Sequence, residues 1–207
     1  MTTIDPRMQR EATRTARRRW QQRIGWLQRL GMLLALAAIG SAQAQAVFTP
    51  YDVEAAYLYN FGKFVRWPVD ASATTAPFTI CILGDDPFGE KLNTLVANEA
   101  IQGRPITTKR LSSVAGAESC QIVFLGLTEQ SRLTKDLTEL SKRPVLTVSN
   151  LPGFLERGGM IQFLQQDNKV RFAVNLTSAE QPGLALSSEL LKVAVHVESK
   201  NAPEVKP

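Results

Sequence analysis

The chain has 207 residues, 44% of them hydrophobic, and a formal net charge of +5. All of the excess positive charge lies in the first 29 residues, where eight arginines accompany only Asp5 and Glu11. The remainder has 16 basic and 17 acidic residues, which excludes the strongly basic surface typical of a nucleic-acid-binding protein. If a leader of 46 residues is removed, about 160 residues remain, which is enough for one domain and too short for two.

A leader precedes the expected domain. The basic start is followed by the apolar run Leu30–Ile39 and by two small-x-small patterns, Ala42–Ala44 and Ala44–Ala46. This order is typical of a secretory signal peptide, which we place at residues 1–46. A membrane anchor is disfavoured because a span needs roughly 20 apolar residues. Arg17–Arg19 leave the general secretory and twin-arginine routes as alternatives, and a basic amphipathic helix is a third interpretation.

The first predicted helix, Asp52–Trp67, carries aromatic residues three or four positions apart, and Pro68 should end it. These residues are Tyr57, Phe61, Phe64 and Trp67. Packing in the core is the simpler explanation of this stripe. The alternative is an exposed aromatic face in which Tyr57, Phe61 and Trp67 bind a partner or an aromatic ligand.

Strands and helices alternate through the next part of the chain. Strands are predicted at Phe78–Leu83, Ile106–Leu111, Cys120–Leu125 and Val145–Val148, and helical segments at Glu90–Asn98, Ser112–Glu118 and from a cap at Thr128 to Lys142. The second strand has mixed polarity, so we expect it near an edge of the sheet. Alternation of this kind is typical of a mostly parallel α/β sheet flanked by helices.

The block that follows the fourth strand is the best-specified part of the sequence. A turn at Asn150–Gly153 is expected from its Pro and Gly. Met160–Leu164 and Val170–Val174 then read as strands joined at Asp167-Asn168, with period-2 alternation in the second. We therefore predict a C-terminal antiparallel hairpin at the edge of the sheet.

One domain is predicted over residues 47–198, and it should end in another helix. Ser187-Ser188 cap a run in which Leu190, Leu191, Ala194 and Val195 share one face. Residues 199–207 are charged and contain proline, so we expect a disordered tail.

Cys81 and Cys120 are the only two cysteines in the chain. Because export leads to an oxidising compartment, a disulfide between them is the default expectation. If the third strand returns beside the first, the two Cα atoms would lie about 5–6 Å apart, which suits a disulfide. Two buried free thiols are the alternative.

Sequence signals for catalysis are weak. Gly84–Lys91 resembles a phosphate-binding loop, but Glu90 stands where that motif has lysine, and Asp85 and Asp86 would repel phosphate. A strand-to-helix turn with an acidic cap is the simpler interpretation. The single histidine, His196, has no nucleophile motif or metal-binding motif around it. We expect neither an enzyme nor a bound cofactor or metal. An enzyme of unknown class that uses a pair of carboxylates for acid–base chemistry is kept as an alternative.

Several short motifs, each weak alone, occur in a characteristic order from about Tyr51 to Val197. They are Ala55–Phe61, Phe64–Pro68, Ile82–Phe88, Thr147–Phe154, Gly158–Ile161, Val170–Phe172, Asn175-Leu176 and Leu184–Leu191. In order and content the chain resembles the YfiR-like periplasmic proteins.

This resemblance implies an α/β regulator in the periplasm. Members of the family are repressors that bind the periplasmic sensor part of an inner-membrane diguanylate cyclase and so lower cyclic di-GMP and biofilm formation. The resemblance also implies a homodimer and a redox-sensitive disulfide, and Cys81 and Cys120 match the family's cysteine positions. Some members have a further cysteine pair where Leu155 and Gln162 stand here, so a second disulfide is not expected. No membrane insertion is expected after cleavage.

Four residues are candidates for contact with the partner: Trp67, Phe154, Arg171 and Asn175. Each also has a structural explanation. Phe154 could anchor the turn, Arg171 could be a solvated strand residue and Asn175 could cap a helix. A second hypothesis is a binding module for a small periplasmic molecule, held near the aromatic face that contains Tyr57.

Overall fold

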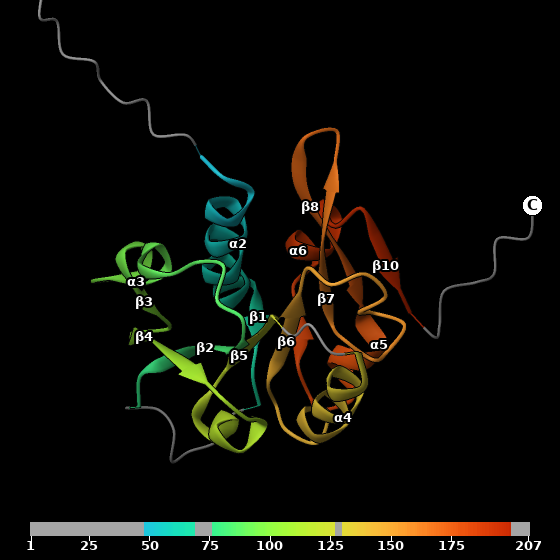
Figure 1. Cartoon of the computed structure of the whole chain (residues 1–207), viewed down its shortest axis with the longest axis horizontal. Helices are drawn as coiled ribbons and strands as arrows, with labels where there is room; N and C mark the ends of the chain where they lie inside the picture. Colours follow the sequence, from blue (N-terminus) through green and yellow to red (C-terminus); the bar gives the residue numbers. More distant parts are fainter. Residues whose placement is uncertain (1–47, 69–75, 127–129, 200–207) are drawn as a thin grey trace, which may run out of the picture. The chain divides into compact units, whose positions relative to one another are not determined.

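The computed structural model describes residues 48–68, 76–126 and 130–199 (Figure 1). The predicted signal peptide, the cap at Thr128 and nearly all of the predicted tail lie outside these residues. The described residues belong to one compact unit that begins at Phe48.

An eight-stranded mixed sheet forms the centre of this unit, in the strand order β10-β8-β7-β6-β5-β2-β4-β3. Its strands are β2 (Phe78–Gly84), β3 (Ala100–Ile101), β4 (Arg104–Leu111), β5 (Ile122–Gly126), β6 (Leu146–Ser149), β7 (Ile161–Gln166), β8 (Lys169–Asn175) and β10 (His196–Glu198). The five strands from β4 to β7 in this order are parallel to their neighbours, and β7 and β8 form the predicted antiparallel hairpin. The predicted mostly parallel α/β class is therefore confirmed.

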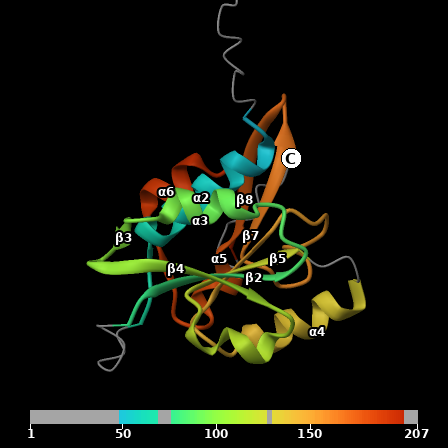
Figure 2. The same ribbon diagram turned by 60° about the vertical axis from the view of Figure 1, so that its left-hand side comes forward.

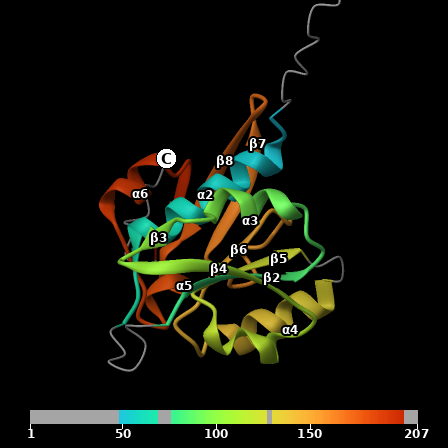
Figure 3. The same ribbon diagram turned by 90° about the vertical axis from the view of Figure 1, so that its left-hand side faces the viewer.

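Helices cover both faces of this sheet. They are α2 (Pro50–Phe64), α3 (Glu90–Val96), α4 (Gln130–Leu140), α5 (Leu176–Glu180), α6 (Ser188–Val193) and the 3₁₀ helix η1 (Val114–Ser119). Helices α2, α3 and α6 lie over one face, whereas η1 and α4 lie over the opposite face (Figure 2 and Figure 3). We call these the α2 face and the α4 face.

Local sequence explains where α2 begins but not where it ends. Asp52 and Thr49 form a reciprocal capping box, and Pro50 occupies the first turn. The helix ends at Phe64, not at Trp67 as predicted, because Val65 turns to an extended conformation. Val65 and Arg66 form β1, which pairs antiparallel with β9 (Ala185–Leu186), so a partner far along the chain overrides local helix propensity.

The end of the chain also differs from the prediction. The last helix, α6, stops at Val193, and His196 lies in β10, which adds to β8 in parallel register. The hairpin is therefore inside the sheet and not at its edge. Ala173 of β8 alternates with the apolar residues Phe172 and Val174. It is nevertheless buried, because the loop carrying Phe154 and Leu155 covers that side of the strand.

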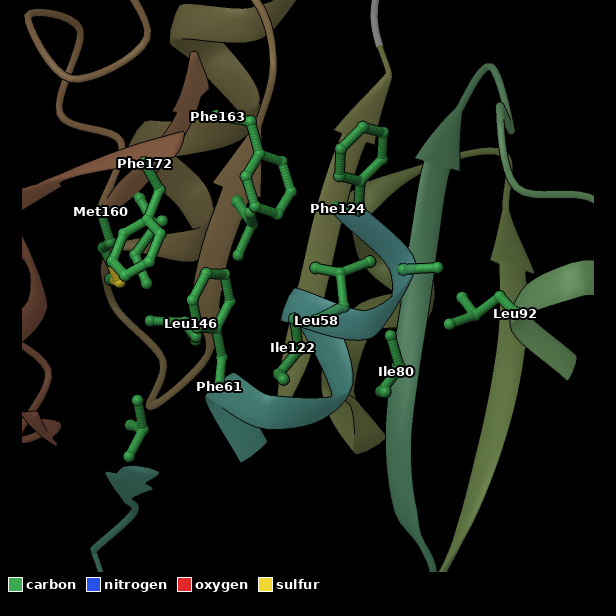
Figure 4. Packing of buried hydrophobic residues seen from close by; sticks show 14 of the residues in the cluster. Leu58, Phe61, Ile80, Leu92, Ile122, Phe124, Leu146, Met160, Phe163 and Phe172 are labelled. Atoms are coloured by element: carbon green, nitrogen blue, oxygen red, sulfur yellow. The ribbon is translucent and has the colours of Figure 1, made fainter. Parts of the chain in front are cut away.

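Each face has its own apolar core. On the α2 face, Leu58 and Phe61 of α2 pack onto side chains from the central strands (Figure 4). On the α4 face, Leu133, Leu137 and Leu140 of α4 share one buried stripe, as their spacing predicts.

Candidate functional site

Two residues of the predicted aromatic stripe, Tyr57 and Phe61, belong to the core. The ring of Phe61 lies 5.1 Å from that of Phe172 and 5.8 Å from that of Phe163, and its side chain is only 1% exposed. Tyr57 joins the same cluster at 5.3 Å from Phe172 and remains partly accessible. Ring pairs at these distances stabilise a core beyond their buried area. Of these rings, only Tyr57 could also meet a ligand from outside.

Trp67 lies apart from that cluster. Its ring makes an edge-on contact with Phe78 at 5.1 Å, and its indole N–H donates a hydrogen bond to the carbonyl of Gln121 at 3.2 Å. Phe78 belongs to β2, four strands from β8, which is about 19 Å at the usual spacing of strands. The structure therefore does not bring Trp67 together with Arg171 or Asn175.

Phe154 lies in the loop that follows β6, and Asn175 reaches the same loop by donating to the carbonyl of Leu155 at 3.4 Å. Each of the two residues has a structural role. Phe154 is fully buried, so its side chain is not on the surface that a partner would meet. The amide oxygen of buried Gln162 accepts hydrogen bonds from the backbone N–H groups of Phe154 and Leu155 at 3.2 and 3.5 Å. Asn175 caps α5 by accepting from the N–H of Ser178 at 2.9 Å, and this satisfies an otherwise unpaired helix donor.

Arg171 is the candidate that faces solvent. It lies on β8 opposite Leu164, and its side chain makes no hydrogen bond or ion pair in the described part of the chain. The hairpin that carries it extends past β6, which pairs with β7 only at Ile161 and Gln162. Arg171 therefore stands on a projecting two-stranded arm, together with exposed Lys169.

Exposed apolar side chains on the helices of the α2 face were not among the predicted site residues. Phe64 is 42% exposed at the end of α2, and Val193 is 63% exposed at the end of α6. A signal for Phe64 was present, since apolar residues of α2 occupy more than the single face that packs on the sheet. Exposed apolar groups of this size are common at protein contacts, though single ones also occur elsewhere.

Glu54 is an unusual charged residue on the inner side of α2. Its side chain is 3% exposed, and it accepts one hydrogen bond, from the amide of Asn150 at 3.3 Å. Desolvation by burial raises the pKa of Glu54 to about 7, against the smaller opposing effect of the Asn150 hydrogen bond. The carboxyl group therefore changes its charge near neutral pH.

The segment that resembles a phosphate loop has a structural role. The carboxylate of Asp86 accepts hydrogen bonds from the N–H groups of Phe88 and Gly89 at 2.8 and 3.1 Å, and it pairs with Arg110 at 2.8 Å. The acidic side chain thus occupies the N–H groups that would cradle a phosphate. The predicted strand-to-helix turn is therefore present. The predicted acidic cap is not, because Gly89 is the N-cap of α3 and no side chain caps that helix.

The predicted disulfide is present between Cys81 and Cys120, whose Cα atoms are 5.9 Å apart. Cys81 lies on β2 and Cys120 lies at the end of η1, just before β5, so the second cysteine is not itself in a strand. Both residues are buried. The bond fixes η1 to the sheet on the α4 face.

The described residues offer little for metal or nucleophile chemistry. His196 is exposed on β10, with its ring nitrogen 3.8 Å from the carboxylate of Glu198. Across residues 48–68, 76–126 and 130–199, no three metal-ligating side chains gather at one place. Within those same ranges, none of the helices has the length and apolar character needed to cross a bilayer.

Comparison with known families decides the assignment. The model of the YfiR/HmsC-like family matches residues 51–195, which is most of the described domain. The chain belongs to the YfiR/HmsC-like family.

Two solved structures are similar to parts of this chain. One is a conserved domain protein from Vibrio cholerae O1 biovar El Tor, with 12% identity over 73% of this chain and a TM-score of 0.49. The other is an ABC domain in complex with L-Trp from Streptococcus pneumoniae, with 11% identity over 58% of this chain and a TM-score of 0.42. The matches span 61% and 56% of those two chains.

Proposed function

We propose that this chain is exported to the periplasm as a non-enzymatic repressor. It binds the periplasmic sensor region of an inner-membrane diguanylate cyclase and so lowers cyclic di-GMP and biofilm formation. The observation that carries the proposal is the family match over residues 51–195, which covers both faces of the sheet as well as the hairpin.

The proposed mechanism requires binding to the sensor and no catalytic step. A protein that binds one conformation of a sensor more tightly than another shifts the sensor's population toward the bound state. Repression therefore requires that this chain prefer the inactive form of the cyclase. The family resemblance also supports a homodimer, which would present two copies of the contact surface.

Arg171 is the member of the predicted contact set that is best placed for this role. It is exposed on the projecting arm, whereas Phe154 is buried and Asn175 is occupied as a helix cap. Trp67 is half-buried beside Phe78 and would act on a separate part of the surface. We therefore place the main contact on the β7–β8 arm.

The test is binding between the purified protein and the periplasmic region of the membrane diguanylate cyclase encoded nearest to it. Arg171→Glu should weaken this binding about tenfold, because reversing a charge at an interface sets two like charges against each other. Lys169→Glu is the matched control, since Lys169 is exposed on the same strand two residues away. Equal loss in both variants would point to general electrostatic attraction and not to contact at Arg171.

A cellular measurement completes the test. Deletion of the gene should raise cyclic di-GMP, and restoring the wild-type protein should lower it again. Mass spectrometry of the mature protein should show cleavage within residues 42–47. Recovery of the uncleaved chain from the cytosol, or cyclic di-GMP that does not change on deletion, would refute the proposal.

A further inference from the structure

Strand β4 has an outer edge that is largely unpaired. On its inner side, all six residues from Ile106 to Leu111 pair with β2. On its outer side, the short strand β3 pairs only with Arg104 and Pro105. From Thr107 to Leu111, no described strand lies on the outer side of β4. Figure 3 shows β4 along the near side of the sheet with β3 at one end.

The direction of the free backbone groups follows from one hydrogen bond. The N–H of Ile106 points outward, because it donates to the carbonyl of Glu99 at 3.1 Å. Successive residues of a strand point their backbone groups to opposite sides, so the N–H and C=O groups of Thr108 and Arg110 also point outward. These groups are available to another extended chain.

Solvent reaches this edge. In β4, Ile106 alone is buried among eight residues, whereas six of the seven residues of β2 are buried. Thr107, Lys109 and Arg110 are exposed. No helix or loop of the described chain therefore covers the edge along this stretch.

The charges beside the edge select the kind of strand that would fit. Arg104, Lys109 and Arg110 lie on β4, which has no acidic residue. Arg110 is balanced by Asp86, whereas Arg104 donates only to backbone carbonyls and the ammonium of Lys109 only to the hydroxyl of Ser119. Positive charge on an edge strand hinders pairing between two copies, since like charges would face each other, and it favours an acidic partner strand.

We propose that the open edge of β4 binds an extended acidic segment of a partner protein, which adds to the sheet as a further strand. The backbone groups of Thr108 and Arg110 supply the hydrogen bonds, and Lys109 with Arg104 supplies the charge preference. Strand addition is a common mode of peptide recognition at exposed sheet edges. This site is separate from the β7–β8 arm, and it does not depend on the identity of the partner proposed above.

The test uses a capped eight-residue peptide in which Glu alternates with Val, and a second peptide in which Lys replaces each Glu. Each peptide is titrated into the mature protein, purified after the cell has removed the signal peptide. Amide exchange is followed by NMR. The acidic peptide should protect the amides of Thr108 and Arg110 and bind about tenfold more tightly than the basic one, as expected for a few cross-strand charge pairs. Failure of the acidic peptide to bind at millimolar concentration, equal binding of both peptides, or protection elsewhere would overturn the proposal.

Two variants check the geometry. Thr108→Pro removes an outward N–H and should abolish binding, as proline is tolerated on edge strands. Lys109→Glu tests the charge without changing the backbone, and it should reduce or reverse the preference for the acidic peptide. Lys169→Glu, on the hairpin arm, is the matched control and should leave peptide binding unchanged. If Lys109→Glu and Lys169→Glu have equal effects, the site is not on β4.

These outcomes separate the two proposals. A wild-type protein that binds the acidic peptide but not the cyclase region refutes the proposed repressor and leaves the β4 site in place. A protein that binds the cyclase region but not the peptide refutes the β4 site and leaves the proposed repressor in place.

Discussion

The α2 face and the α4 face of the sheet are stabilised in different ways. On the α2 face, one helix of 15 residues lies along the sheet and buries Leu58 and Phe61 among aromatic side chains. On the α4 face, the covering elements include a six-residue 3₁₀ helix and the loop that carries Phe154. A short element buries too little apolar surface to hold itself in place, since burial contributes roughly 25 cal/mol per Å².

Specific bonds supplement packing on the α4 face. The disulfide ties η1 to β2, and Gln162 holds the loop by two backbone hydrogen bonds. The hydroxyl of Ser149 donates to the carbonyl of Leu125 at 2.6 Å within the same layer. The difference suggests that the α2 face should respond mainly to loss of volume and the α4 face mainly to loss of particular bonds.

The largest expected effect is on the α2 face. Phe61→Ala should lower the free energy of unfolding by about 3–5 kcal/mol, because it removes a buried ring and leaves a cavity. Urea denaturation measures this loss. Phe64→Ala, three residues later on the same helix, is the control and should cost less than about 1 kcal/mol, since Phe64 is exposed. Similar losses in both variants would mean that α2 does not pack as described.

Removal of the disulfide should have a comparable but smaller effect, located on the other face. Cys81→Ala with Cys120→Ala opens a loop with a sequence separation of 39, and the chain-entropy model then gives a loss of about 3–4 kcal/mol. Amide exchange should increase in η1 and remain slow in α2. A reductant should destabilise the wild type and leave the double variant unchanged; faster exchange in α2 as well would show that the faces are not independent.

The smallest effect concerns the buried carboxyl group on the α2 face. Because the pKa of Glu54 rises from 4.5 to about 7 on folding, the folded protein holds its proton more tightly than the unfolded chain. Stability from this group is complete below pH 4.5 and is lost as the pH rises to about 7. Glu54→Gln keeps the shape and removes the titration, so at pH 8 it should be more stable than the wild type by about 2 kcal/mol.

Urea midpoints at pH 5, 6, 7 and 8 measure this difference. The urea midpoint of the wild type should decrease from pH 5 to pH 8 relative to that of Glu54→Gln. Glu156→Gln is a suitable control, since Glu156 is exposed. Parallel curves for the wild type and Glu54→Gln would show that Glu54 is ionised in the folded protein throughout.

Much of the fold follows from patterns that are local in the sequence. The long strands and helices were predicted because each carries its own periodicity, as in the Leu133, Leu137 and Leu140 stripe of α4. The strands β1, β3, β9 and β10 were missed because each has only two or three residues, too few to show a period. They exist through pairing with segments elsewhere in the sheet, which a single sequence does not display.

The candidate site was harder to predict than the fold. Surface position depends on what covers a residue, and neither the loop over Phe154 nor the role of Gln162 is visible from residue type. The exposure of Arg171 could be predicted, because the alternation of apolar and polar residues in its strand assigns it to the polar side. The open edge of β4 was only hinted at by the mixed polarity of that strand.

The pairing of β1 with β9 joins Val65, at the end of the first helix, to Leu186 near the end of the chain. During synthesis the N-terminus emerges first. The pairing of β1 with β9 therefore cannot form until most of the polypeptide has been made, and until then α2 and its apolar face lack it. Folding that depends on such distant contacts is slow, because the chain loses the entropy of closing the loop before the contact can stabilise it. The nascent chain therefore stays without this closure until almost all of it has appeared, which gives chaperones a long interval in which to bind it.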